Sequence, residues 1–296
     1  MSSENSGHTC EPFARLMWRA LTLLAALVVA RLVLELAGVS ADITRFVSST
    51  AGMLFVGLYV AAVGPLRGGL RKSSQMFLPA LIIAAWTEGL IILVTIIAAV
   101  LRLSRSHFAE AEDYGNWAHL GRHLVGHLVE ILVFFVVILL LMAVVRMLWR
   151  WPVTVAPGVM LGVFVIMRFW TEAMGLPPFR TAAWSSTILV LLSAFYLGGV
   201  GGRMGLTGAR QLLVPSLVVG WAWRLWVYIA TLFAAAVPFF KTHFFDPSLG
   251  NVPGRLLRAL GATVIEGFIV GLLVWGIATW IAGATRTDSN ISAGSA

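Results

Sequence analysis

Residues Phe77–Val100 read FLPALIIAAWTEGLIILVTIIAAV, an apolar stretch with one ionisable side chain, Glu88, near its middle. A related stretch follows later in the chain: PSLVVGWAWRL from Pro215 matches PALIIAAWTEG from Pro79, and Arg224 stands in the place of Glu88. About 20 apolar residues suffice to cross a membrane as a helix. An ionisable side chain inside such a span costs roughly 3 kcal/mol or more, so by default it faces the protein interior and has a partner. The two stretches therefore predict two membrane helices with opposite central charges.

The composition extends this prediction to the whole chain. Of the 296 residues, 59% are hydrophobic and 11% are charged, and the mean hydropathy is +0.90, which is far more apolar than a soluble domain. The apolar runs are continuous and lack the alternation of outer-membrane barrel strands, so helices are predicted. The expected class is an all-α integral membrane protein with about eight transmembrane helices. The candidate spans are 21–37, 47–66, 77–100, 124–148, 153–174, 183–200, 212–233 and 256–282.

The charge and cysteine content exclude several other classes. The net charge is +8, but the Lys and Arg residues lie mostly at span ends, where orientation in the membrane explains them. No basic patch interleaved with aromatic residues indicates nucleic acid, so none is expected as a partner. The single cysteine, Cys10, excludes an internal disulfide and a thiolate metal cluster.

The second half of the chain repeats features of the first at an offset of 135 to 137 residues. Because chance matches would not keep one offset through an entire half-chain, the sequence predicts two tandem four-helix repeats. The matching features are Arg31 and Arg168, Glu35 and Glu172, Gly38 and Gly175, Ser48-Ser49-Thr50 and Ser185-Ser186-Thr187, Arg67 and Arg203, Pro79 and Pro215, His107-Phe108 and His243-Phe244, Gly115-Asn116 and Gly250-Asn251, and Glu130 and Glu266.

This repeat gives the expected organisation and topology. The predicted parts are a disordered cytoplasmic tail at 1–14, membrane repeats at 15–150 and 151–284, and a second disordered cytoplasmic tail at 285–296. Because each half holds four spans, the halves share one orientation and are related by an axis along the membrane normal. The short basic connections favour cytoplasmic termini and a multi-pass protein of the inner membrane. The lipid bilayer is the expected partner, and a homo-oligomer or other membrane subunits are both compatible with the sequence.

Charged side chains within the predicted spans are the first functional signal. Five carboxylates accompany three guanidinium groups, and this excess of carboxylates is what proton or cation handling would need. Two Arg–Glu pairs are four residues apart, as in an ion pair on one helix face. Glu88 and Arg224 would face each other if both point inward. The alternative is that the charges only lock helices together. The predicted network is Arg31, Glu35, Glu88, Glu130, Arg168, Glu172, Arg224 and Glu266.

A histidine stripe is the second signal. His119, His123, His127 and Glu130 recur at i, i+4, i+8 and i+11, which keeps them on one narrow face of a helix. Such a stripe could share a metal ion, hold a haem or relay protons inward to Glu130. A polar face at the membrane interface is the alternative without chemistry. The second half does not keep the stripe, and the sequence requires no cofactor.

These signals lead to two main hypotheses of function. The first is a permease- or channel-like protein, coupled to protons or cations, with a buried charged site between two repeats that opens to the outer face. The alternative is a non-transporting subunit of a larger membrane complex, redox for example, with the His119–Glu130 stripe near a metal, haem or quinone. A membrane-embedded enzyme acting on lipid ranks last, because the His/Glu stripe is its only support and the sequence shows no hydrolase elbow or desaturase-type histidine box.

Overall fold

The computed structural model describes residues 10–181, 184–206, 208–237 and 241–293. This part of the chain is helical and contains no strand, only an isolated bridge between Thr242 and Phe245. Eight of its helical segments are long and apolar enough to cross a membrane, which confirms the predicted class and number of spans. The long helices are α1 (Cys10–Leu36), α3 (Ser49–Val63), α4 (Phe77–Val100), α5 (Trp117–Leu148), α6 (Val155–Ala173), α8 (Ser186–Gly201), α9 (Ala209–Ala236) and α10 (Val252–Ala293).

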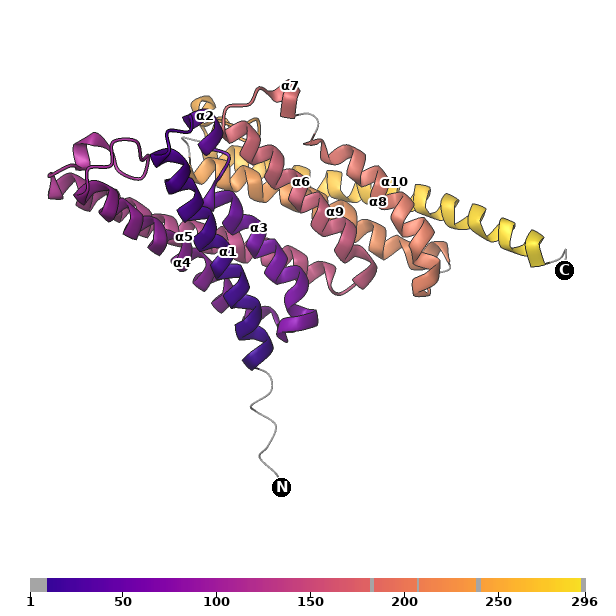
Figure 1. Cartoon of the computed structure of the whole chain (residues 1–296). Helices are drawn as coiled ribbons and strands as arrows, with labels where there is room; N and C mark the ends of the chain where they lie inside the picture. Colours follow the sequence, from indigo (N-terminus) through magenta and orange to yellow (C-terminus); the bar gives the residue numbers. More distant parts are fainter. Residues whose placement is uncertain (1–9, 182–183, 207, 238–240, 294–296) are drawn as a thin grey trace. The chain divides into compact units, whose positions relative to one another are not determined.

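Short helical pieces connect these spans (Figure 1). The α-helix of α3 continues through a π-helical turn, η1, which ends at the left-handed Gly69. Both α1 and α10 extend into segments that the sequence predicted as tails. The connecting pieces are α2 (Ala41–Thr44), η1 (Gly64–Gly68), η2 (Ser73–Met76), η3 (Ala111–Asp113), η4 (Pro152–Thr154), α7 (Pro178–Thr181), η6 (Gly202–Met204) and η7 (Pro247–Leu249).

The chain forms two compact units that meet in sequence between Ala143 and Val144, within α5. In the first unit α1, α3 and α4 pack against one another. Trp86 of α4 donates its indole N–H to the carbonyl of Leu21 on α1 at 3.1 Å. The part of α5 in this unit lies beside α4, and the rings of Phe77 and Phe135 meet edge to face with centroids 4.8 Å apart.

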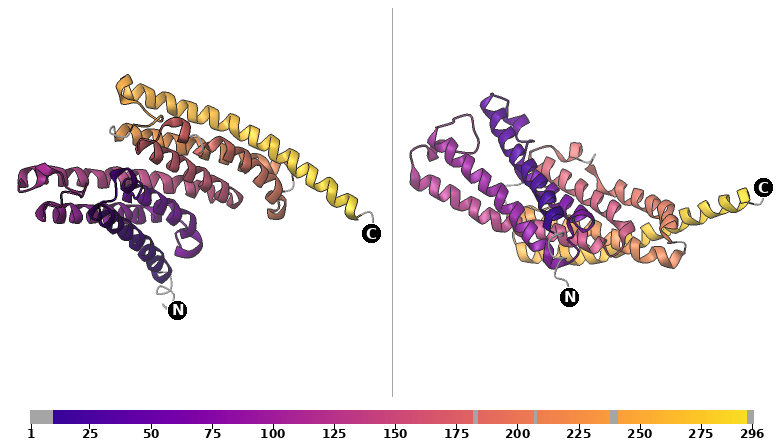
Figure 2. Two further views of the ribbon diagram at one scale, coloured as in Figure 1. Left: turned by 45° about the horizontal axis from the view of Figure 1, so that its top comes forward. Right: turned by 60° about the horizontal axis from the view of Figure 1, so that its bottom comes forward.

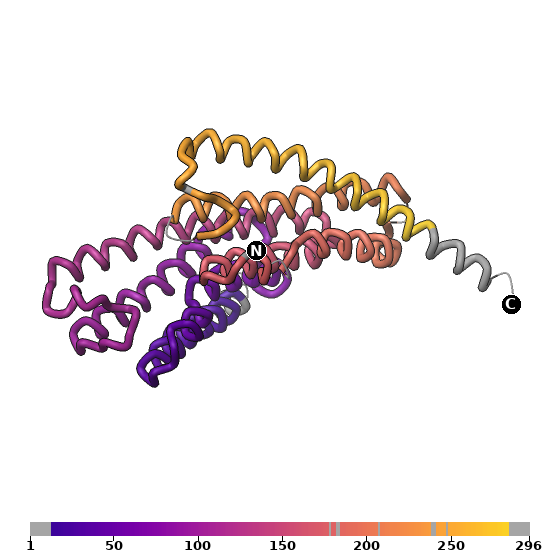
Figure 3. The backbone as a smooth tube through the Cα atoms, turned by 90° about the horizontal axis from the view of Figure 1, so that it is seen from above, coloured from indigo at the N-terminus to yellow at the C-terminus, as the bar shows by residue number. Residues whose placement is uncertain are grey.

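The loop of residues 101–116 joins α4 to α5 and closes one end of the first unit. Figure 3 shows this loop in magenta between the ends of the two helices. Phe108 and Ala109 of the loop are buried in an apolar cluster with residues of α1, α4 and α5. This burial fixes the loop against the first turns of α5, where the histidine stripe begins. The cluster consists of Val28, Ile91, Val94, Ala98, Ala99, Phe108, Ala109 and Leu120.

The second unit is held together by close backbone contacts at glycine. Helices α9 and α10 run side by side (Figure 2) and meet where Gly220 faces Gly267 and Gly271. A Cβ atom at position 220 would lie only 2.4 Å from the carbonyl oxygen of Gly267, so only glycine fits there. Packing through small residues is how helices associate within lipid. Trp226 of α9 also donates its indole N–H to the carbonyl of Gly158 on α6 at 2.8 Å.

Two of the helices end in the same way and thereby place a glutamate beside a loop. Gly38 after α1 and Gly175 after α6 adopt left-handed φ angles of 82° and 83°. The amide of Gly38 bonds to the carbonyl of Glu35, and the amide of Gly175 bonds to that of Glu172. Together with the bonds one residue further out, this pattern is a Schellman motif, which stops a helix and turns the chain away. Each glutamate therefore lies in the last turn of its helix.

Candidate functional site

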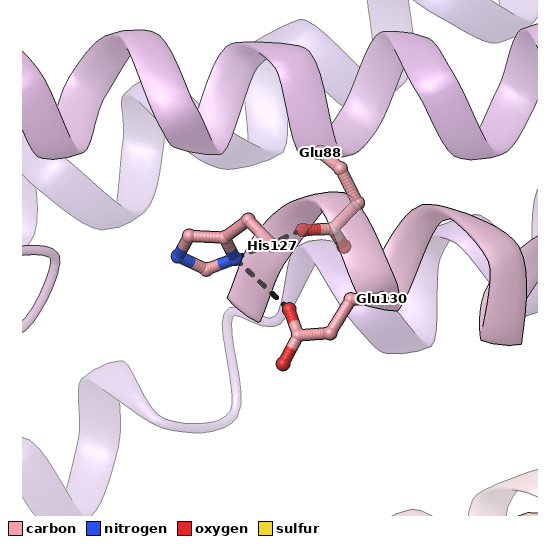
Figure 4. Close-up of side chains that lie close together, drawn as sticks. All are labelled: Glu88, His127 and Glu130. Atoms are coloured by element: carbon pink, nitrogen blue, oxygen red, sulfur yellow. Dashed lines mark hydrogen bonds and ion pairs between the residues drawn. The ribbon is translucent and has the colours of Figure 1, made fainter. Parts of the chain in front are cut away.

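Glu88 lies in the middle of α4 and is buried, with 1% of its surface exposed. One of its oxygens, Oε2, is 3.1 Å from Nδ1 of His127 on α5. The same nitrogen lies 2.9 Å from Oε2 of Glu130, which is one turn further along α5. Figure 4 shows one imidazole nitrogen of His127 facing both carboxylates. Two helices thus bring a Glu–His–Glu cluster together inside the predicted spans.

The two carboxylates of the cluster can carry more negative charge than the one imidazole can neutralise. A single imidazole nitrogen carries at most one hydrogen, so His127 Nδ1 cannot donate a full hydrogen bond to both carboxylates. The second oxygen of Glu88, Oε1, is buried and has no hydrogen-bond partner among the residues that the structure describes. Burial of an unpaired charge is expensive. Either a proton on one carboxylate or an added cation would neutralise the cluster.

The first two histidines of the stripe bind a different carboxylate. Nδ1 of His119 lies 2.8 Å from Oδ1 of Asp113, and Nδ1 of His123 lies 2.9 Å from Oδ2 of the same side chain. Asp113 is buried in the 3₁₀ turn η3, and its Oδ2 also accepts the amide of Glu110. Burial acts to raise the pKa of Asp113. The hydrogen bonds from the two histidines and the amide outweigh this effect and hold the pKa below its ordinary value.

The stripe is therefore divided into two parts that still touch. The rings of His123 and His127 stack with centroids 5.2 Å apart, so the Asp113 cluster and the Glu88 cluster are neighbours along α5. His127 and Glu130 contact each other as their spacing predicts, whereas His119 and His123 turn to the loop. A cavity of ≈ 230 Å³ lies next to Asp113. It is lined by Ala99, Val100, Arg102, Gly115, Trp117 and Leu120 in addition to Asp113.

A second kind of site occurs once in each unit. In the first, Glu35 accepts a hydrogen bond from Nε of Arg31 at 3.2 Å and from the backbone amide of His107 at 3.1 Å. Nδ1 of His107 lies 2.6 Å from the same carboxylate. The ring of His107 packs on Phe108, with centroids 4.1 Å apart. This Arg–Glu–His cluster ties the loop of residues 101–116 to the last turn of α1.

The second unit contains the same arrangement at the end of α6. Glu172 accepts from Nε of Arg168 at 3.1 Å and from the amide of His243 at 2.9 Å. Nδ1 of His243 lies 2.5 Å from Glu172, and its ring packs on Phe244 with centroids 4.0 Å apart. Thr181 adds one more hydrogen bond to the Glu172 carboxylate, at 2.9 Å. The loop before α10 is thus held to α6 as the loop before α5 is held to α1.

Arg224 and Glu266, the last two residues of the predicted network, contact each other within the second unit. Nη2 of Arg224 on α9 forms an ion pair with Oε2 of Glu266 on α10 at 3.0 Å. Glu88 and Arg224, which the sequence suggested as mutual partners, each have a partner inside their own unit. Glu266 remains 49% exposed, whereas Arg224 is 17% exposed.

Three participating residues were missed as site residues from the sequence. Asp113 lies in a polar loop among other acidic residues, and only its position a few residues before His119 could have suggested it. His107 and His243 recur at the repeat offset, each beside a phenylalanine, but neither belongs to the predicted charge network. That recurrence was the available signal. No protein family, curated protein or solved structure matches the chain significantly.

Proposed function

We propose that the protein is a permease- or channel-like, proton- or cation-coupled membrane protein whose cation-accepting centre is Glu88, His127 and Glu130. The observation that carries the proposal is the buried Glu88, which shares a single imidazole nitrogen with Glu130 and keeps one oxygen unpaired among the described residues. A purely structural ion pair would combine opposite charges. This cluster instead combines two acids with one imidazole, which favours the uptake of a positive charge from outside the chain.

The proposal includes a route to the centre along one face of α5. Asp113, His119 and His123 lie on the loop side of the centre, and the stacked rings of His123 and His127 connect the two groups. The cavity beside Asp113 lies at the outer end of this route. A row of neighbouring imidazoles and carboxylates is the kind of arrangement that passes protons or binds cations near neutral pH.

The proposal also includes two tandem four-helix repeats in parallel orientation, in the inner membrane, with both termini in the cytoplasm. Supporting this, the two Arg–Glu–His clusters have closely similar contacts, and their residues are 136 or 137 positions apart in sequence. Eight spans return the chain to its starting side. On this topology the loops that carry His107 and His243 face outward, and the Asp113 end of α5 is the outer entrance.

Vesicles that contain the purified full-length chain test the proposal. An imposed gradient of protons, alkali cations or divalent cations should drive flux through the wild-type protein, and Glu88→Gln should reduce this flux at least tenfold, because a neutral amide cannot compensate a cation. Glu112→Gln is the matched control: it makes the same chemical change on the exposed loop and should leave the flux unchanged. Equal flux through wild-type and Glu88→Gln proteins, or flux of none of these ions, would overturn the proposal.

A further inference from the structure

The Glu–His–Glu cluster offers three donor atoms at metal-ligand spacing. Nδ1 of His127 and one carboxylate oxygen from each of Glu88 and Glu130 all lie within 4.8 Å of one another. Bonds of about 2.1 Å in a tetrahedral site place neighbouring ligand atoms about 3.4 Å apart. The two N···O separations, 3.1 and 2.9 Å, therefore need to open by only about 0.5 Å or less to admit an ion. Oε1 of Glu88 is buried and has no partner among the described residues, which independently indicates a missing positive ligand.

The corresponding positions of the second unit hold residues that neutralise each other without an ion. The residues 136 positions after Glu88, His127 and Glu130 are Arg224, Thr263 and Glu266. There the guanidinium of Arg224 neutralises Glu266 directly, at 3.0 Å. Thr263 is buried and donates its hydroxyl to a carbonyl of its own helix, so it contributes no charge. In the first unit the arginine is replaced by an acid and a nitrogen ligand is added.

The donor set indicates the class of cation. Mg²⁺ and Ca²⁺ are bound by oxygen ligands, usually six or more in number, and make little use of imidazole. Copper(I) prefers thiolates and thioethers, and the cluster offers neither. One imidazole with two carboxylates suits Zn²⁺, Mn²⁺ and related first-row ions, and two carboxylates balance the charge of a divalent ion. Three protein ligands leave at least one coordination position open, which permits exchange.

We propose that Glu88, His127 and Glu130 bind one divalent first-row transition-metal ion, such as Zn²⁺ or Mn²⁺. This ion is the cation of the permease, so the inference rests on the proposed function and specifies its substrate class. Asp113, His119 and His123 form the outer part of the path to the ion, because the ring of His123 stacks on that of the ligand His127.

Equilibrium dialysis of the purified full-length protein tests the site directly. The wild type should retain one Zn²⁺ or Mn²⁺ per chain in excess Mg²⁺ and Ca²⁺, and Co²⁺ should give the visible spectrum of an ion with nitrogen and oxygen ligands. Glu88→Gln and His127→Asn should weaken retention at least tenfold. Glu266→Gln is the matched control, because it removes the equivalent carboxylate of the second unit and should retain the metal at wild-type affinity.

Glu88→Arg keeps the test decisive if the neutral variants fold poorly. It copies the Arg224–Glu266 pair into the first unit, so this variant should fold, pair its introduced guanidinium with Glu130 and retain no metal. Retention by Glu88→Arg or Glu88→Gln at wild-type affinity, or displacement by Mg²⁺, would overturn the inference. Flux in vesicles treated with a chelator, together with no metal retention by the wild type, would overturn the metal site alone. Stoichiometric retention without any flux would leave the site standing and overturn the permease.

Discussion

The charge of Asp113 joins the loop of residues 101–116 to two turns of α5, through His119 and His123. Its pKa is held below the ordinary value of about 4, so the charged form stabilises the folded state. This contribution is fully present above about pH 4, where the unfolded chain is also ionised, and is lost as the pH falls through the lower pKa of the folded state. At pH 7, Asp113→Asn should therefore lower stability by about 1–3 kcal/mol, measured by thermal unfolding in detergent.

The pH dependence distinguishes the charge from the shape of the Asp113 side chain. Below about pH 4 the difference between wild type and Asp113→Asn should shrink, because the wild-type aspartate becomes neutral as well. A difference in stability that is equally large at pH 7 and pH 3 would show that the charge of Asp113 is not the cause.

Removing the charge of Glu35 or of Glu172 should loosen only the loop that this glutamate holds, which carries His107 or His243, respectively. Glu172→Gln should release His243 and speed the cleavage by trypsin after the exposed Lys241, because the amide keeps the shape but loses two charge-assisted hydrogen bonds. Glu35→Gln should instead speed cleavage after the exposed Arg105, beside His107. Each variant is the control for the other. Faster cleavage at both loops in either variant would indicate general unfolding.

At the scale of helices, the contact between α9 and α10 depends on glycine. A Cβ atom at position 220 would meet the carbonyl oxygen of Gly267 at 2.4 Å and the amide nitrogen of Gly271 at 2.5 Å. Because backbone atoms cannot turn away as a side chain can, Gly220→Ala should force the helices apart and lower stability by about 1–3 kcal/mol. Thermal unfolding in detergent measures the loss.

The control for this contact lies on the same pair of helices. A Cβ atom at Gly276 of α10 would meet nothing within 4 Å, so Gly276→Ala should be neutral or slightly stabilising, by up to about 1 kcal/mol. Equal losses for Gly220→Ala and Gly276→Ala would show that the close approach of the two helices does not matter to stability.

Which helices exist could be predicted from the sequence, but which faces meet could not. Eight continuous apolar runs predicted the eight long helices, because a helix that crosses a membrane needs about 20 apolar residues. The spacing of His127 and Glu130 predicted their contact, because it depends only on helix geometry. The pairing of Glu88 with His127 depends on how α4 and α5 pack. Helix α5 has a polar stripe, but α4 is apolar on nearly every side around Glu88, so its sequence does not mark the face that meets α5. Asp113 was missed because loop conformation is not periodic.

At the scale of the whole molecule, eight candidate spans predict that the two chain ends lie on the same side of the membrane. The single natural cysteine, Cys10, reports one end, and a Cys10→Ser, Ser295→Cys variant reports the other. Both should react with a membrane-impermeant maleimide only after the membrane of intact cells is opened, since the basic connections favour cytoplasmic termini. Labelling of the two ends from opposite sides would require an odd number of spans.

The glycine contact in the second unit also limits how the protein can move. Backbones that touch at Gly220 and Gly267 leave no layer of side chains on which α9 and α10 could slide or roll past each other. The two helices are therefore expected to move together as one rigid body. Spin labels placed along α9 and α10 should keep constant separations with and without an imposed ion gradient, and a change in these separations would show that the helices slide or roll.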